Sequence, residues 1–164
     1  MKNLYIDFDG VICNTIEITY KMMKEKGIDI NEREKVIEFY KELDWESVLN
    51  KCENINDSMN NIKKIMNSGK FNVAILTHVN SMNEIICKVK YIRNYLRDVT
   101  IIPVPKSISK TNMINARFSI LVDDYPVNLD EWKQDGGIGV RFDLDLDGKG
   151  YLVINKLDEL LELF

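Results

Sequence analysis

The sequence predicts an α/β domain with three layers, in which helices cover both faces of a mostly parallel β-sheet. Two observations favour this class. Over residues 70–164, short apolar runs typical of buried strands alternate with amphipathic stretches typical of helices. Over residues 14–69, only helical patterns occur, which predicts a helical insertion after the first strand.

The predicted strands are short apolar runs that end at polar or turn-forming residues. They cover residues 4–8, 71–76, 99–104, 118–122 and 138–142, with a short sixth at 151–154. Because helices connect most of these runs, the strands are expected to lie parallel, in a Rossmann-like arrangement.

The predicted helices of the insertion cover residues 15–26, 32–43, 45–51 and 58–68. Ser81 and Glu84 have the spacing of a capping box, which predicts a further helix extending to about residue 97. Shorter helices are predicted to begin at Asn128 and Asn155. The chain would then divide into a core domain, residues 1–13 and 70–164, and a small helical cap, residues 14–69.

Length and composition narrow the range of possible functions and partners. A chain of 164 residues with 45% hydrophobic and 29% charged residues suits one globular domain. A net charge of −4 argues against a nucleic-acid polymer as partner, and no apolar run is long enough to span a membrane. Cys13, Cys52 and Cys87 share no CxxC spacing, which indicates reduced thiols and a cytoplasmic location. The oligomeric state is left open.

Asp7 and Asp9 lie at the end of the first predicted strand. The period of two in an extended chain places both carboxylates on one side. Carboxylates this close repel each other unless a cation lies between them, and Mg²⁺ prefers carboxylate oxygens. Gly10 permits a tight departure from the strand. The alternative, an acidic surface turn, is disfavoured because an aspartate inside a buried run is costly without a purpose.

A second acidic pair, Asp123 and Asp124, follows the fourth predicted strand. In open α/β sheets, ligands bind at the carboxyl ends of the strands. We therefore expect both acidic pairs to form one magnesium site, although a capped turn before the helix at Asn128 is the simpler alternative.

Three further polar positions follow strand ends. Thr77 ends the second run, and its hydroxyl with nearby N–H groups can bind a phosphate oxygen. His78, the only histidine, lies beside it. Lys106 or Lys110 can neutralise a phosphate. Taken alone, each of these residues has a simpler interpretation than phosphate binding: the threonine merely ends a strand, and the lysines are solvated surface residues.

These motifs, in this order, resemble the haloacid dehalogenase-like (HAD) superfamily. The run Asp7-Phe8-Asp9-Gly10-Val11 is similar to its first motif, Leu76-Thr77 to the second, a lysine to the third and Asp123-Asp124 to the fourth. The run Asp123-Asp124-Tyr125-Pro126 looks like the 5'(3')-deoxyribonucleotidase branch, the cytosolic type C deoxy 5' nucleotidases. Asn14 is a departure, since many relatives carry an acidic residue there.

The resemblance implies a magnesium-dependent phosphomonoester hydrolase that acts through an aspartyl-phosphate. Asp7 would be the nucleophile and Asp9 the acid/base. Thr77, His78 and Lys110, preferred over Lys106, would hold the phosphate. The metal ligands would be Asp7, Asp9 and one of the second acidic pair, with Asp124 favoured over Asp123.

The substrate implied is a small phosphorylated molecule, with 5'- or 3'-nucleoside monophosphates favoured. A sugar phosphate or another phosphorylated metabolite is the alternative. A catalytically silent binding module is a third, less favoured reading. The cap between the first and second motifs would select the leaving group.

Residues 143–148, Asp-Leu-Asp-Leu-Asp-Gly, contain a second DxDG and begin like a calcium-binding loop. A calcium loop needs a bidentate glutamate at its twelfth position, where this chain has Ile154. The segment is therefore predicted to be a polar loop.

Overall fold

The computed structural model describes residues 1–164 and contains one six-stranded sheet with the order β3-β2-β1-β4-β5-β6. Every neighbouring pair is parallel. The strands are β1 (Lys2–Ile6), β2 (Phe71–Val79), β3 (Thr100–Pro105), β4 (Ile120–Asp123), β5 (Ile138–Phe142) and β6 (Leu152–Ile154). The predicted α/β class is confirmed. The strand order changes direction between β1 and β4, where a doubly wound sheet opens its ligand crevice.

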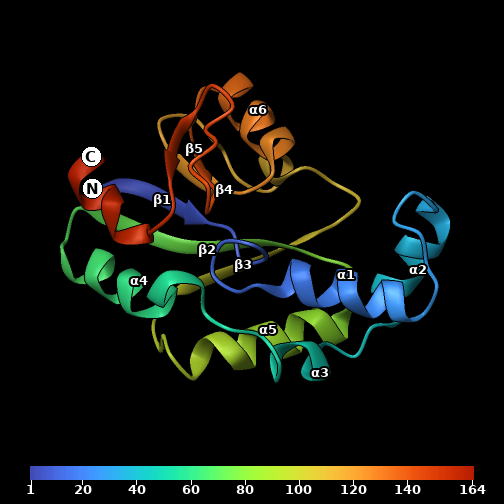
Figure 1. Ribbon diagram of the computed structural model, residues 1–164. Coiled ribbons are helices and arrows are strands. Elements are labelled where there is room, and N and C mark those ends of the chain that lie inside the picture. Colours follow the sequence, from blue (N-terminus) through green and yellow to red (C-terminus); the bar gives the residue numbers. More distant parts are fainter.

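Helices cover both faces of this sheet. They are α1 (Thr15–Glu25), α2 (Arg33–Glu42), α3 (Trp45–Leu49), α4 (Ser58–Asn67), α5 (Met82–Arg93), α6 (Pro126–Gln134) and α7 (Leu160–Leu163). Single 3₁₀ turns cover Ile55–Asp57, Lys110–Asn112 and Leu157–Glu159. Figure 1 shows α4 and α5 on one side of the sheet, α6 on the other, and both termini at the end away from α2. None of these helices is long and apolar enough to cross a bilayer.

The sheet is buried on both faces, which explains the nearly continuous apolar runs of its strands. On one face, Ile6 of β1 and Ile75 of β2 pack in one cluster with Ile62 of α4. On the other, Trp132 of α6 packs against Tyr5 of β1, with 5.3 Å between ring centroids. Burial of this apolar surface stabilises the three-layer arrangement by about 25 cal/mol for each Å² removed from water.

Several element boundaries differ from the sequence-based expectation. The first strand ends at Ile6, so Asp7 and Asp9 lie in the following loop and are not side by side on an extended strand. Strand β2 continues to Val79 because its residues from Ala74 to Val79 pair with β3. Helix α6 begins at Pro126, ahead of the predicted start at Asn128, since proline fits the first helical turn.

The predicted capping box at the start of α5 forms only in part. Ser81 Oγ accepts the Glu84 N–H at 3.1 Å, as expected. The Glu84 carboxylate, however, accepts the Asn80 N–H at 2.6 Å and pairs with Lys88 at 2.7 Å. Helix α5 also ends at Arg93, earlier than the predicted residue 97.

The C-terminal segments agree in outline with the expectation. A helical segment follows Asn155, but it consists of a 3₁₀ turn and the short α7. Residues 143–148 form the predicted polar loop, in which Asp143 Oδ1 accepts the N–H of Asp145 at 3.0 Å.

The inserted helices form two groups. Helices α1 to α3 build their own apolar cluster, which contains Met23, Phe39, Leu43, Trp45 and Val48. Helix α4 instead packs Met59, Ile62 and Ile65 into the cluster beneath the sheet. This packing favours a cap made of α1 to α3, and the predicted cap of residues 14–69 stays a prediction.

Candidate active site

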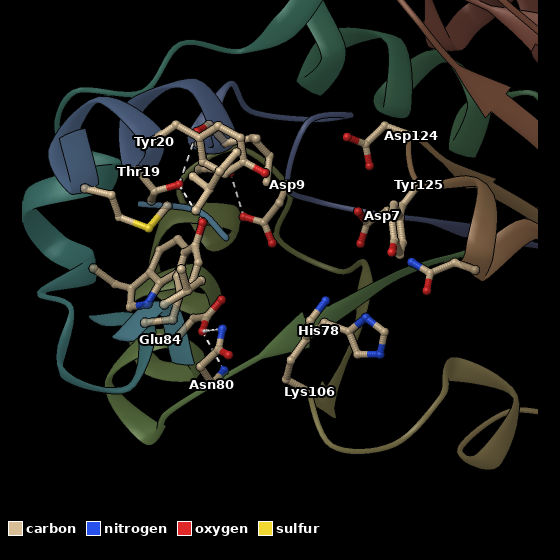
Figure 2. A pocket seen from close by; sticks show the side chains of 18 of the residues that line it. Asp7, Asp9, Thr19, Tyr20, His78, Asn80, Glu84, Lys106, Asp124 and Tyr125 are labelled. Atoms are coloured by element: carbon tan, nitrogen blue, oxygen red, sulfur yellow. Dashed lines mark hydrogen bonds between the residues drawn. The ribbon is translucent and has the colours of Figure 1, made fainter. Parts of the chain in front are cut away.

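The carboxyl ends of β1 and β4 lie side by side and open into a cavity of about 360 Å³. Asp7 directly follows β1, and its N–H donates to Val122 O of β4 at 2.9 Å. In Figure 2, Asp7 and Asp124 lie together on one side of the pocket, and Asp9 lies toward Thr19 and Tyr20 of α1. The cavity therefore has an acidic end at the sheet and a second end formed by the inserted helices.

A buried lysine joins the first acidic motif to the second. Lys110 Nζ lies 2.7 Å from Asp7 Oδ1 and 2.7 Å from Asp123 Oδ2, and its side chain is 1% exposed. Asp123 Oδ2 also accepts from Asn128 Nδ2 at 2.9 Å, and Oδ1 accepts the Tyr125 N–H at 2.9 Å. Both oxygens of Asp123 are thus engaged by the protein. The opposite charges raise the pKa of Lys110, which keeps it protonated.

The acidic end is suited to a divalent cation. Asp7, Asp123 and Asp124 each present a carboxylate oxygen within 4.8 Å of the others. Burial, together with the neighbouring carboxylates, raises the pKa of Asp7 to about 7 and that of Asp124 to about 8. A cation between these oxygens would relieve both effects, and clustered carboxylates are the ligands that Mg²⁺ prefers.

Gly10 brings the first motif close to the fourth. Its φ of +77° lies in the left-handed region, and a Cβ there would overlap the Asp124 carboxylate. The glycine is therefore required both by the backbone turn after Asp9 and by the approach of Asp124.

We expect Gly10→Ala to weaken Mg²⁺ binding and to destabilise the fold by about 1–2 kcal/mol from backbone strain alone. The reason is that the added methyl group displaces Asp124. The measurement is thermal unfolding with and without Mg²⁺. Gly27→Ala is the matched control, because Gly27 also has a positive φ (+70°) but nothing lies within 4 Å of an added Cβ. An equal loss of Mg²⁺-dependent stabilisation in both variants would contradict this role.

Asp9 is held through both of its oxygens. Oδ1 accepts from Thr15 Oγ1 at 2.6 Å, and Oδ2 accepts from Lys88 Nζ at 2.5 Å and from Thr77 Oγ1 at 3.5 Å. Lys88 was not anticipated from the sequence, because it belongs to no motif. The available signal was its i,i+4 spacing from Glu84 on a predicted helix, which is also common on solvated surfaces.

The other predicted phosphate ligands lie nearby. Thr77 is buried next to Lys88, whose Nζ donates to Thr77 Oγ1 at 3.1 Å. His78 and Lys106 line the cavity. The His78 Nε2–H donates to Ile108 O at 3.0 Å, and burial with nearby Lys110 and Lys106 lowers the pKa of His78 to about 4. The imidazole is therefore neutral at neutral pH and acts as a donor fixed to the backbone.

The sequence matches no family model and no curated protein. Solved structures, in contrast, match it over nearly the whole chain. A HAD-superfamily hydrolase of subfamily IA, variant 1, from Geobacter sulfurreducens superimposes with a TM-score of 0.65 at 14% identity, covering 100% of both chains. A HAD phosphatase from Thermococcus onnurineus gives a TM-score of 0.63 at 13% identity, over 99% of this chain and 97% of that one.

The chain has the fold of the HAD-superfamily hydrolases. A hydrolase from Pseudomonas syringae gives a similar superposition, with a TM-score of 0.63 at 11% identity over 99% of this chain and 98% of that one. At these identities the likeness is one of fold. Within this HAD fold, the acids of the first and fourth motifs line one cavity at the strand ends. Thr77 and Lys110 are buried and contact Asp9 and Asp7 without lining the cavity.

Proposed function

We propose that this protein is a magnesium-dependent phosphomonoester hydrolase with Asp7 as its nucleophile. The observation that carries the proposal is the Asp7 carboxylate, held at the end of β1 by the buried Lys110 and close to Asp124. Lys110 engages Oδ1 and leaves the other oxygen for attack on phosphorus. The HAD fold supports a hydrolase, because the solved structures that share it include a HAD phosphatase.

The proposed reaction has two steps. Asp7 attacks phosphorus and forms an aspartyl-phosphate, while Asp9 gives a proton to the leaving oxygen. Asp9 then takes a proton from the water that hydrolyses the intermediate. Asp9 lines the cavity between Asp7 and the inserted helices. This position suits an acid/base, because the leaving group would lie on that side of the phosphate.

The metal would be held by Asp7 and Asp124, with the Asp9 backbone carbonyl as implied by the family resemblance. Asp124 is favoured over Asp123 because both Asp123 oxygens already accept hydrogen bonds from Lys110, Asn128 and the Tyr125 N–H. Bound there, Mg²⁺ would neutralise negative charge where two anions meet.

The phosphoryl oxygens would be bound by Thr77 and Lys110, with Lys106 as the alternative lysine. The neutral His78 imidazole, whose N–H is engaged by Ile108 O, would lie beside them without donating to them. Lys110 lies against the nucleophile but is engaged by two carboxylates. Lys106 lines the cavity. In this arrangement Lys110 orients Asp7, and Lys106 is available to a phosphate at the cavity surface.

The residues that the inserted helices contribute to the cavity favour a small, uncharged leaving group. Their end of the cavity is lined by apolar and aromatic side chains, and Lys106 is the only lysine or arginine among all the lining residues. A volume of about 360 Å³ lies at the lower end of pockets for small ligands. Trp45 also lines the cavity, where it adds apolar aromatic surface.

These features favour a 5'- or 3'-nucleoside monophosphate, whose base and sugar are uncharged and carry acceptors. A sugar phosphate is the alternative, since it offers acceptors but less apolar surface. A cytoplasmic location stays a prediction; the cysteines are free thiols, consistent with it.

The test is phosphate release, with Mg²⁺, from nucleoside monophosphates, sugar phosphates and a monophosphate with a carboxylate in its leaving group. We expect the lowest KM for a nucleoside monophosphate and the highest for the carboxylate-bearing compound, because no cation lines the leaving-group end. Preference for a sugar phosphate would support the alternative. Failure to hydrolyse any monophosphate would overturn the hydrolase proposal and favour a catalytically silent binding module.

A further inference from the structure

Helix α5 carries a fully buried lysine in contact with the acid/base. Lys88 is 1% exposed, and its Nζ lies 2.5 Å from Asp9 Oδ2, 2.7 Å from Glu84 Oε1 and 3.1 Å from Thr77 Oγ1. Burial of an ammonium group costs several kcal/mol unless charges and hydrogen bonds compensate it. Here two carboxylates and a hydroxyl do so, and Asp9 is the only one of these carboxylates that the proposed reaction uses.

Aromatic rings hold the ammonium group in place. Nζ lies 5.3 Å from the ring centroid of Phe8, which separates Asp7 from Asp9, and 4.7 Å from that of Trp45, at the start of α3. Each ring face attracts the cation. Lys88 therefore links the loop after β1, helix α5 and the inserted helices at one point.

We propose that Lys88 is a positioning residue that decides which oxygen of Asp9 faces the leaving group, an inference that rests on the proposed hydrolase function. Lys88 donates to Oδ2, and the Thr77 hydroxyl lies within 3.5 Å of the same atom. A proton on Oδ2 would point at the Lys88 ammonium group, which has only donors and cannot accept it. The proton that Asp9 transfers is therefore carried on Oδ1, whose only partner is the Thr15 hydroxyl. This hydroxyl can donate to the ionised oxygen and accept when the oxygen is protonated.

The step that depends on this orientation is the first half-reaction. An oxygen of Asp7 forms a bond to phosphorus, and the bond between phosphorus and the leaving oxygen breaks. The electron pair of that bond stays on the leaving oxygen, which takes the proton from Asp9 Oδ1. Glu84 acts indirectly, through Lys88. It pairs with Lys88 one turn along α5 and so keeps the ammonium group between two carboxylates.

The test compares a simple alkyl monophosphate, whose leaving group needs a proton, with p-nitrophenyl phosphate, whose leaving group departs as a stable anion. The value of kcat/KM reports the steps up to formation of the aspartyl-phosphate. For Lys88→Met we expect kcat/KM to fall about 10²-fold or more with the alkyl compound, in the range of general-acid effects. With p-nitrophenyl phosphate we expect a fall of less than about threefold, because that step does not use the Asp9 proton.

Two companion variants keep the result interpretable. Lys90→Met changes an exposed lysine of the same helix and should leave both substrates unaffected, since its side chain is 76% exposed. Glu84→Gln preserves the side-chain shape and leaves Lys88 paired with Asp9. It should fold even if Lys88→Met does not, and it should lower the alkyl-to-aryl ratio in the same direction but by less.

A gain in activity, or an equal fall with both substrates in Lys88→Met or in Glu84→Gln, would overturn the positioning role and leave the hydrolase proposal standing. Failure of the unmodified protein to hydrolyse these two compounds and every nucleoside monophosphate and sugar phosphate would overturn both proposals.

Discussion

Replacing Asp7 with asparagine is expected to lower kcat on the preferred monophosphate by a factor on the order of 10⁴ or more, to the level of the assay background. The amide keeps the shape of the side chain and can still accept from Lys110, but it cannot form the aspartyl-phosphate. Removal of a covalent nucleophile has effects of this size. The measurement is phosphate release at saturating substrate and Mg²⁺.

The same substitution is expected to leave the fold intact and to raise its melting temperature at pH 8. Burial and the neighbouring Asp123 and Asp9 raise the pKa of Asp7 to about 7, so its ionised form is disfavoured in the metal-free folded protein. The neutral amide avoids that cost. Asp135→Asn, at the exposed end of α6, is the matched control and should change neither property. A variant that retains more than about one hundredth of the activity would exclude Asp7 as the nucleophile.

Mg²⁺ is expected to stabilise the protein strongly at pH 8 and weakly at pH 5. Burial and neighbouring carboxylates raise the pKa of Asp7 to about 7 and that of Asp124 to about 8. The ordinary pKa of an aspartate is about 3.9. Without metal, the folded state binds more protons than the unfolded state between these limits. The contribution of these two groups to stability is therefore fully present at low pH and is lost as pH rises to 7 for Asp7 and to 8 for Asp124. Mg²⁺ must displace those protons, so it binds tightly only where the carboxylates are ionised.

At a hundredfold excess over Kd, a ligand of the folded state adds about 2.7 kcal/mol. In a domain of this size that corresponds to about 5–11 °C in melting temperature. Thermal unfolding at pH 5 and pH 8, with Mg²⁺ or with a chelator, measures the difference. Asp124→Asn should abolish the Mg²⁺ effect at pH 8 more completely than Asp123→Asn, if Asp124 is the direct ligand. Equal Mg²⁺ stabilisation at both pH values would contradict the assignment of these carboxylates to the metal.

The local sequence was sufficient to predict the fold class and to place two acidic motifs at strand ends that lie together in the structure. Apolar runs of four to six residues specify buried strands because burial on both faces leaves little room for polar side chains. The acids that interrupt or end these runs, Asp7 and Asp123, therefore mark the edge of the sheet. The parallel order then brings the two strand ends together, since equivalent ends of parallel strands lie at one edge of the sheet.

Tertiary structure decided how the individual side chains are used. The distinction between Asp123 and Asp124 depends on Lys110, Asn128 and the Tyr125 N–H, which all converge on Asp123. No spacing along the chain indicates which carboxylate of a consecutive pair faces a lysine. The same holds for Gly10, whose missing side chain makes room for an acid more than a hundred residues away.

What the sequence by itself determined is the order of strands and helices and the acids at the strand ends, because periodicity and strand termination are local properties of the chain. Only the tertiary structure showed that Lys88, which pairs with Glu84 on a helix after β2, reaches Asp9 in the loop after β1. The physical reason is that a buried charge is tolerated only where partners from distant segments meet it. Those partners meet only when distant segments pack together, so the spacing of residues within one motif does not predict them.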